Sequence, residues 1–167
     1  KVSCKESLET LKKWLKEGIP SAETLVDFPW EVEERGPSSI RAVHPRFPIG
    51  IDIICSDEAR SIRVIVLTKF DTINLDNKTR IKLYRRLLRM NNMPLSKYIL
   101  YGEDDTIGVA VDLSIYSLGK REFNDALAFL LGALVTVAKE VGVEEELYKS
   151  MVEEPAHLVA KHFEEGW

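Results

Sequence analysis

The strongest constraint on the fold is a stretch, residues 122–139, that is predicted to be a helix with apolar side chains on nearly every side. Its apolar residues are Phe123, Ala126, Leu127, Ala128, Phe129, Leu130, Leu131, Ala133, Leu134, Val135, Val137 and Ala138. A surface helix that covers a single core keeps a polar face toward water. We therefore expect this helix to be covered on two sides, on one of them by a sheet.

The cover on the second side is expected to be another subunit, although a second layer of the same chain is the alternative. The apolar run is bracketed by Asp125 and Lys139. It is too short to cross a bilayer, which takes roughly 20 apolar residues. Each large apolar side chain left in water would forfeit roughly 1.5–3 kcal/mol. The sequence thus predicts a homodimer and no membrane association.

The composition is that of a folded protein. The chain has 167 residues, of which 45% are hydrophobic and 30% are charged, and its net charge is −4 at pH 7. This length favours one domain, and the acidic balance disfavours nucleic acid as a partner of the whole molecule. No signal peptide or lipidation motif is recognised, so we expect a cytoplasmic location. Glutamine is absent while Lys, Arg and Glu are plentiful, which is typical of thermophiles.

The two cysteines, Cys4 and Cys55, allow two interpretations. Each lies among apolar or helical neighbours. A free cysteine in such surroundings behaves as a small buried hydrophobe, which is the preferred interpretation. A bridge between the two is the other, because intracellular disulfides do occur in hyperthermophiles.

Hydrophobic periodicity predicts the order of the elements. The predicted elements are a helix over 3–17, strands over 25–34, 40–43, 49–56 and 60–70, a basic helix over 78–91, strands over 97–101 and 107–113, and the apolar helix. This order, α-β-β-β-β-α-β-β-α, predicts an α+β fold in which helices pack on an antiparallel sheet of five to six strands. We expect residues 1–142 to form one α+β domain and residues 143–167 a helical extension.

No catalytic or metal-binding pattern emerges. His157 and His162 are five residues apart, which does not put both rings on one face of a helix, and His44 lies far away in the sequence. No adjacent cysteine pair completes a zinc pattern. Cys55 shares a predicted strand face with isoleucines, where a thiolate would be costly to form. We therefore expect no enzymatic activity, no cofactor and no metal.

One local motif carries a family resemblance. The segment Leu87–Tyr98, LLRMNNMPLSKY, ends a helix with asparagine and enters the next strand through a Leu-x-Lys/aromatic step. An acidic hairpin turn, a strand ending near Asp112 and a helix rich in Ala and Leu follow. Over residues 25–141 this arrangement resembles the YbjN / type III secretion chaperone-like family. The resemblance implies dimers without catalytic residues, several of which hold extended segments of partner polypeptides on apolar grooves.

Two functions follow as hypotheses. The first is a noncatalytic dimeric binding module, chaperone- or adaptor-like, that holds an apolar or extended partner polypeptide between the apolar helix and the sheet. Its candidate partner-binding residues are Phe123, Leu127, Phe129, Leu130 and Leu134. The alternative is a nucleic-acid or anion-binding protein that uses the basic helix Lys78–Arg89, through Arg85, Arg86 and Arg89.

Overall fold

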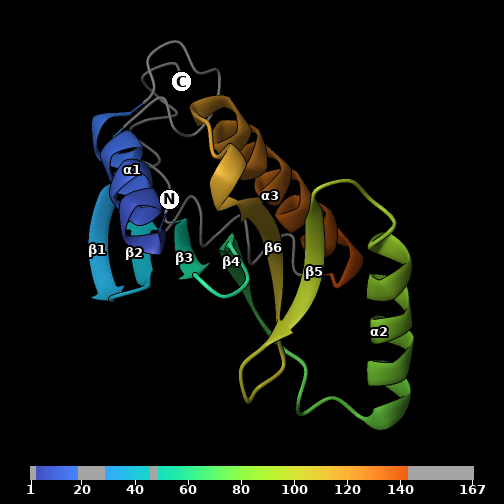
Figure 1. Ribbon diagram of the computed structural model, residues 1–167. Coiled ribbons are helices and arrows are strands. Elements are labelled where there is room, and N and C mark those ends of the chain that lie inside the picture. The colour runs from blue at the N-terminus through green and yellow to red at the C-terminus, as the bar shows by residue number, and fades with distance from the viewer. Residues whose placement is uncertain (1–2, 19–28, 46–48, 143–167) are drawn as a thin grey trace, which may run out of the picture.

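A six-stranded antiparallel sheet with the order β1-β2-β3-β4-β6-β5 organises the protein (Figure 1). The structure is a computed structural model and describes residues 3–18, 29–45 and 49–142. The strands are β1 (Glu31–Gly36), β2 (Ser39–Val43), β3 (Gly50–Ser56), β4 (Ser61–Asp71), β5 (Ser96–Tyr101) and β6 (Thr106–Ser114). The helices are α1 (Cys4–Glu17), α2 (Asn77–Met90), the short 3-10 helix η2 (Ile115–Ser117) and α3 (Lys120–Glu140). The predicted α+β class and element order are confirmed.

Alternation along the central strands sets the two faces of the sheet. Ile53 pairs with Val64, which in turn pairs with Val111, and all three are buried. The neighbouring residues along each strand point to the other face of the sheet. There Arg63 forms an ion pair with Asp112 at 2.7 Å. Such exposed pairs contribute little to stability. The burial pattern therefore identifies one face of the sheet as the core face.

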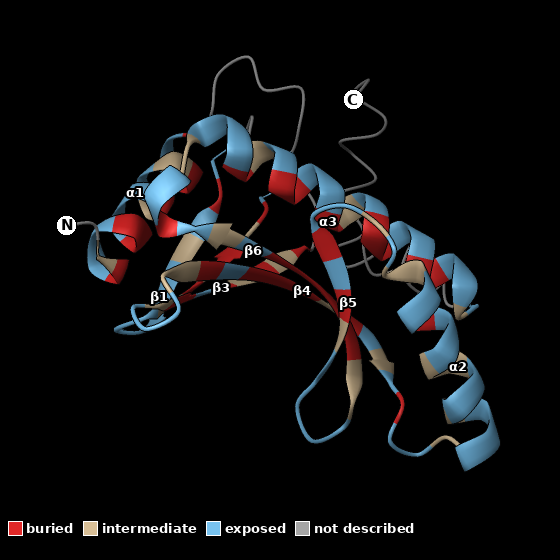
Figure 2. Cartoon of the chain, turned by 45° about the vertical axis from the view of Figure 1, so that its right-hand side comes forward, coloured by how far each residue is buried: buried red, intermediate tan, exposed pale blue. Residues whose placement is uncertain are grey.

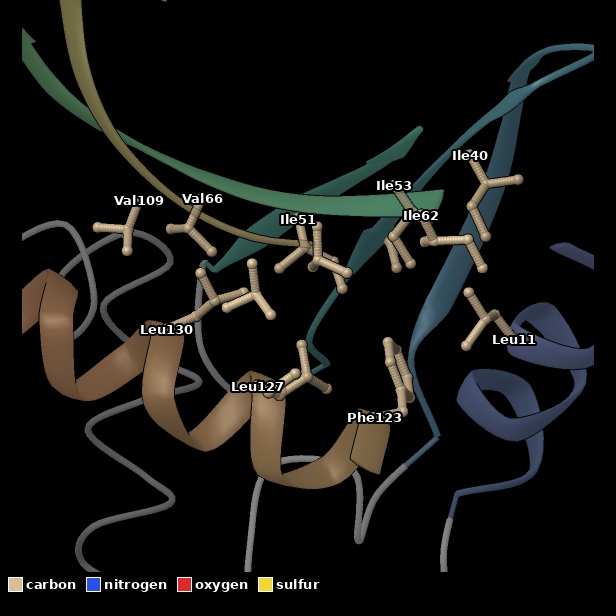
Figure 3. Close-up of a cluster of buried hydrophobic side chains, with 14 of the residues drawn as sticks. Leu11, Ile40, Ile51, Ile53, Ile62, Val66, Val109, Phe123, Leu127 and Leu130 are labelled. Atoms are coloured by element: carbon tan, nitrogen blue, oxygen red, sulfur yellow. The ribbon is translucent and has the colours of Figure 1, made fainter. Parts of the chain in front are cut away.

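Helices α1 and α3 lie on this core face, with their buried residues turned toward the sheet (Figure 2). Phe123, Leu127 and Leu130 point from α3 toward the strands, and Leu11 projects from α1 (Figure 3). All four side chains are almost fully buried. Burying each of them contributes roughly 1.5–3 kcal/mol, so both helices stabilise the fold through their contacts with the sheet.

A disulfide joins the first turn of α1 to β3. Cys4 and Cys55 are both buried, and their sulfur atoms are 2.10 Å apart. The backbone N–H of Cys4 also donates to Asp57 Oδ1 at 3.0 Å, in the turn after β3. The expected burial of both cysteines is confirmed, but their preferred interpretation as separate thiols is wrong. A pattern of neighbours in sequence cannot show that the helix start lies directly over the third strand.

Two other predictions concern the ends of the described ranges. The strand predicted over 25–34 begins at Glu31, and residues 25–28 lie outside the described residues. Pro29, within the predicted strand, lacks a backbone N–H and so favours a place at a sheet edge. The structure confirms this place, since β1 is an edge strand. The predicted helical extension, residues 143–167, also lies outside them. None of the described helices is long and apolar enough to cross a membrane.

Helix α2 stands beside β5 at the opposite end of the sheet from α1 (Figure 1). Asp76 caps its start by accepting from the backbone N–H of Thr79 at 2.8 Å, and this bond lowers the pKa of the Asp76 carboxyl. Leu87 is the buried residue of α2, whereas Ile81 and Leu88 are exposed. The helix is thus held by Leu87 in its second half and by Tyr84, whose Oη lies 2.6 Å from Thr72 Oγ1 in the segment before the helix.

Candidate functional site

An apolar groove lies between α3 and the segment that joins α2 to β5. Its volume is ≈ 490 Å³. The lining residues are Met90, Met93, Pro94, Ser96, Tyr98, Ala128, Phe129, Gly132, Ala133 and Thr136. The residues that define this groove come from a helix end, a connecting loop, an edge strand and one side of α3, so the fold has to be complete before the groove exists.

The few polar groups of the groove are already used inside the protein. Tyr98 Oη donates to the Ala133 carbonyl at 2.9 Å, and Thr136 Oγ1 donates to the Gly132 carbonyl at 2.9 Å. Ser96 Oγ lies 3.8 Å from Met93 Sδ. Sites for small polar substrates present convergent polar groups that fix the orientation of the ligand. This groove presents apolar surface instead.

Tyr98 forms the floor of the groove and ties β5 to α3. Its side chain is buried. Burial raises the pKa of the Tyr98 phenol, and the negative charge of Glu140 raises it further. The phenol therefore stays protonated at neutral pH and keeps donating to the Ala133 carbonyl. The bond holds β5 against α3 at the groove.

The wall on α3 combines small residues with one aromatic side chain. Ala128, Gly132 and Thr136 are spaced by four residues and so lie in one row along the helix. A Cβ atom added at Gly132 would meet nothing within 4 Å, so the space above it is open. Beside this row stands Phe129, which is 43% exposed. The small residues next to the exposed Phe129 ring leave a hollow on the surface of α3 that is large enough for an apolar side chain.

The wall on the α2 side contains two methionines. Next to it, an ion pair joins α2 to α3. Met90 and Met93 are half-buried, and such side chains adapt to different apolar surfaces. Arg86, one turn before Met90, reaches Glu140 of α3 at 2.8 Å. The pair bridges the two helices next to the groove, and the contact raises the pKa of Arg86.

Leu95, which lies between the lining residues Pro94 and Ser96, has an unusual backbone. Its φ angle is 63°, and the backbone N–H of Ser96 donates to the Pro94 carbonyl at 2.8 Å across it. This is a γ-turn with a left-handed central residue, which is rare and strained for a leucine. The side chain is 51% exposed. The strained turn therefore presents an apolar side chain to solvent.

The edge of β5 is occupied by a side chain of the chain itself. Asn91 Nδ2 donates to the Tyr98 carbonyl at 3.2 Å, and the Tyr98 N–H donates to Asn91 Oδ1 at 2.7 Å. The carboxamide thus makes the two bonds that a neighbouring strand would make. An open edge strand is a template for pairing with another chain. Asn91 removes that template at the middle of β5.

We expect Asn91→Ala to lower the free energy of unfolding by about 1–2 kcal/mol, because two hydrogen bonds are lost. The freed edge is also expected to increase concentration-dependent self-association. Urea denaturation and sedimentation velocity measure the two effects. Asn92→Ala is the matched control, since Asn92 is exposed and adjacent in sequence. Equal behaviour of the two variants would contradict the role given to Asn91.

The structure separates the predicted partner-binding residues. Phe129 lines the groove, whereas Phe123, Leu127, Leu130 and Leu134 are buried in the core beneath the sheet. These four side chains have no surface left for a partner. Since α3 is apolar all round, its sequence does not show which row faces the sheet. The methionines, Tyr98 and Gly132 were not among the predicted residues, because their role depends on how α2 and β5 approach α3.

The basic residues of α2 lie on one side of the helix. Arg85 and Arg89 are four residues apart, and Arg86 lies between them. All three are exposed. Arg86 is paired with Glu140, while Arg85 and Arg89 form no ion pair with any described residue. The predicted anion-binding residues thus form an open surface beside the groove rather than a pocket.

The remaining candidates for chemistry have structural positions. His44 is buried, and its ring packs edge-on against Trp30 with ring centres 5.1 Å apart. His157 and His162 lie outside the described residues. Cys55 is in the disulfide and has no thiol to ionise. Among the described residues, no group of three or more His, Cys, Asp or Glu side chains could hold a metal ion.

Comparisons with known proteins place the chain in a family without giving its function. No curated protein matches the chain. A solved structure, that of the ExsC–ExsE complex, contains a similar chain with 14% sequence identity and a TM-score of 0.46. The match covers 75% of this chain and 88% of that chain. So low a TM-score carries no functional argument. Residues 10–141 match the family described as a domain of unknown function, DUF8183, and the chain therefore belongs to that family.

Proposed function

We propose that this protein is a noncatalytic binding module, chaperone- or adaptor-like, that holds an apolar segment of a partner polypeptide in the groove. The observation that carries the proposal is the lining of the groove, in which every polar side-chain group is already bonded internally. Clefts that bind ligands have volumes of roughly 300–1,000 Å³. The ≈ 490 Å³ of this groove has room for several apolar side chains.

The strained turn at Leu95 is a second observation that supports the proposal. Leu95 is held exposed by a backbone conformation that costs about 1–3 kcal/mol in residues of this kind. Nothing in the packing of the core requires a leucine there, since half of its surface meets solvent. Strained residues of this kind cluster at ligand-binding sites. A partner segment that enters the groove would cover Leu95 and Phe129 together.

Binding of anions or nucleic acid by Arg85, Arg86 and Arg89 is the competing function. Their common side on α2 favours it, whereas the pairing of Arg86 with Glu140 and the net charge of −4 count against it. Binding to phosphates weakens steeply as salt rises, and binding of apolar segments does not.

The predicted homodimer is also part of our proposal. The molecular mass in solution, measured by light scattering, tests it.

We expect Gly132→Trp to abolish polypeptide binding while leaving the fold intact. The new side chain enters open space and fills the groove, and tryptophan has a higher helix propensity than glycine. Fluorescein-labelled, carboxymethylated α-lactalbumin serves as a permanently unfolded probe, with anisotropy as the readout. We expect at least a tenfold loss of affinity. Binding by the native protein is expected to persist in 0.5 M NaCl.

Val135→Trp is the matched control, because Val135 is exposed on α3 but does not line the groove. Leu95→Asn is a second test, since asparagine tolerates the left-handed backbone but removes the apolar side chain. It is expected to weaken binding without loss of stability. If the native protein, Gly132→Trp and Val135→Trp bind the probe with equal affinity, the groove is not the binding site. Tighter, salt-sensitive binding of a single-stranded DNA oligonucleotide would favour the anion hypothesis.

A further inference from the structure

We infer that the segment held in the groove is a short amphipathic helix with acidic residues facing α2, and not a strand added to β5. The inference rests on the proposed function and names the class of partner. Three observations carry it: the closed edge of β5, the shape of the α3 wall and the charges along α2.

Strand addition requires free backbone groups at a sheet edge. On β5 the two groups of Tyr98 are bonded to Asn91, and the Ser96 N–H is bonded to the Pro94 carbonyl. An incoming strand would have to displace these three bonds to pair along the first half of β5, which is the half that borders the groove. The partner is therefore bound through side chains, and the groove beside β5 is where apolar side chains can enter.

The α3 wall fits a helix. From Ala128 to Thr136 the row of small residues covers eight residue steps, or about 12 Å at the helical rise. Two helices pack 8–10 Å apart depending on the side chains at the contact, and small residues permit the closer distance. The open space over Gly132 lies at the centre of this row. A helix of about two turns would place anchors at i, i+3 or i+4, and i+7 against it.

The basic residues along α2 favour acidic residues on the polar side of the partner helix. Lys82, Arg86 and Arg89 recur at spacings of four and three residues and share one side of α2. Arg86 reaches Glu140 of α3, and Lys82 and Arg89 flank Arg86 on the same side of α2. Lys82 and Arg89 form no ion pair with any described residue, so they are available to carboxylates of a partner. Asp125, one turn before the α3 row, disfavours acids at that end.

A peptide display selection tests the inference. A library of random 16-residue peptides is selected on the immobilised full-length protein and counter-selected on the Gly132→Trp variant. We expect enriched peptides with apolar residues at i, i+3 or i+4, and i+7, and with an excess of Asp and Glu. The double variant Lys82→Glu, Arg89→Glu is expected to bind the best peptide at least tenfold more weakly. The matched control, Lys5→Glu with Lys13→Glu, changes two exposed lysines of α1 and is expected to bind normally.

The outcomes separate this inference from the proposed function. Enriched peptides with apolar residues at every second position would overturn the helix while leaving the groove as a binding site. Enrichment without acidic residues would overturn the charge assignment. If no peptide is enriched, because every peptide that binds the native protein is removed by counter-selection on Gly132→Trp, both proposals are overturned. If Gly132→Trp converts a dimer into a monomer in light scattering, a second copy occupies the groove and the inference fails.

Discussion

Reduction of the disulfide between Cys4 and Cys55 is expected to lower the free energy of unfolding by about 4 kcal/mol. The two residues are 51 positions apart in sequence. In the chain-entropy account, a cross-link that closes a loop of this length removes about 4 kcal/mol of conformational freedom from the unfolded chain. A loss of this size is a large part of the total stability of a typical domain, about 5–15 kcal/mol. Urea denaturation with and without a phosphine reductant measures it.

The double variant Cys4→Ala, Cys55→Ala is the control for this result. It is expected to show a similar loss in stability and no response to the reductant. Mass spectrometry of the native protein after alkylation counts its free thiols, and none is expected. Two alkylated cysteines in the unreduced protein, or a loss below about 1 kcal/mol on reduction, would contradict the role of the bond.

Two neighbouring residues of α3 are expected to respond to alanine in opposite ways. Leu130→Ala should cost about 3 kcal/mol of stability, because Leu130 is fully buried against the sheet and a cavity would remain. Phe129→Ala should cost less than about 1 kcal/mol, because Phe129 is 43% exposed. The same Phe129→Ala variant is expected to lose at least tenfold in affinity for the unfolded α-lactalbumin probe. Thermal and urea denaturation together with anisotropy measure the two effects.

The two variants, Leu130→Ala and Phe129→Ala, distinguish a core residue from a groove residue within a single helical turn. Each variant is the control for the other, since both remove a large apolar side chain from adjacent positions. A large stability loss for Phe129→Ala would place its ring in the core and remove it from the groove. Normal probe binding by Phe129→Ala would show that another part of the surface binds the probe.

The fold could be predicted from the sequence because its elements have strong local signals. The alternation of isoleucine and valine through Ile51, Ile53, Val64 and Val66 sets the strands and their core face. Pro29 indicated that the first strand belongs at an edge, and β1 is an edge strand of the sheet. These features depend on residues close together in the chain.

The candidate site could be predicted only in part. The sequence identified α3 as a helix with more apolar surface than one sheet covers, and Phe129 on it. Which row of α3 is free depends on where β5 and the end of α2 lie, and that is a property of the packed structure. Asn91 was recognised as a helix end, but its pairing with the backbone of Tyr98 joins positions that only the turn at Leu95 brings together. The disulfide likewise depends on a long-range contact.

The disulfide joins α1 to β3, whereas the groove lies beside β5, the edge strand three strands away in the sheet (Figure 1). We expect this separation to give the two regions unequal rigidity. The first third of the fold is a covalent ring, whereas the walls around Tyr98 are held by weaker, reversible contacts. Local opening in proteins spans a wide range of free energies. Amide protons near the ring should exchange with solvent more slowly than those near the walls. If the groove holds a partner segment as proposed, we expect its walls to adjust to different segments while the region closed by the disulfide keeps its shape.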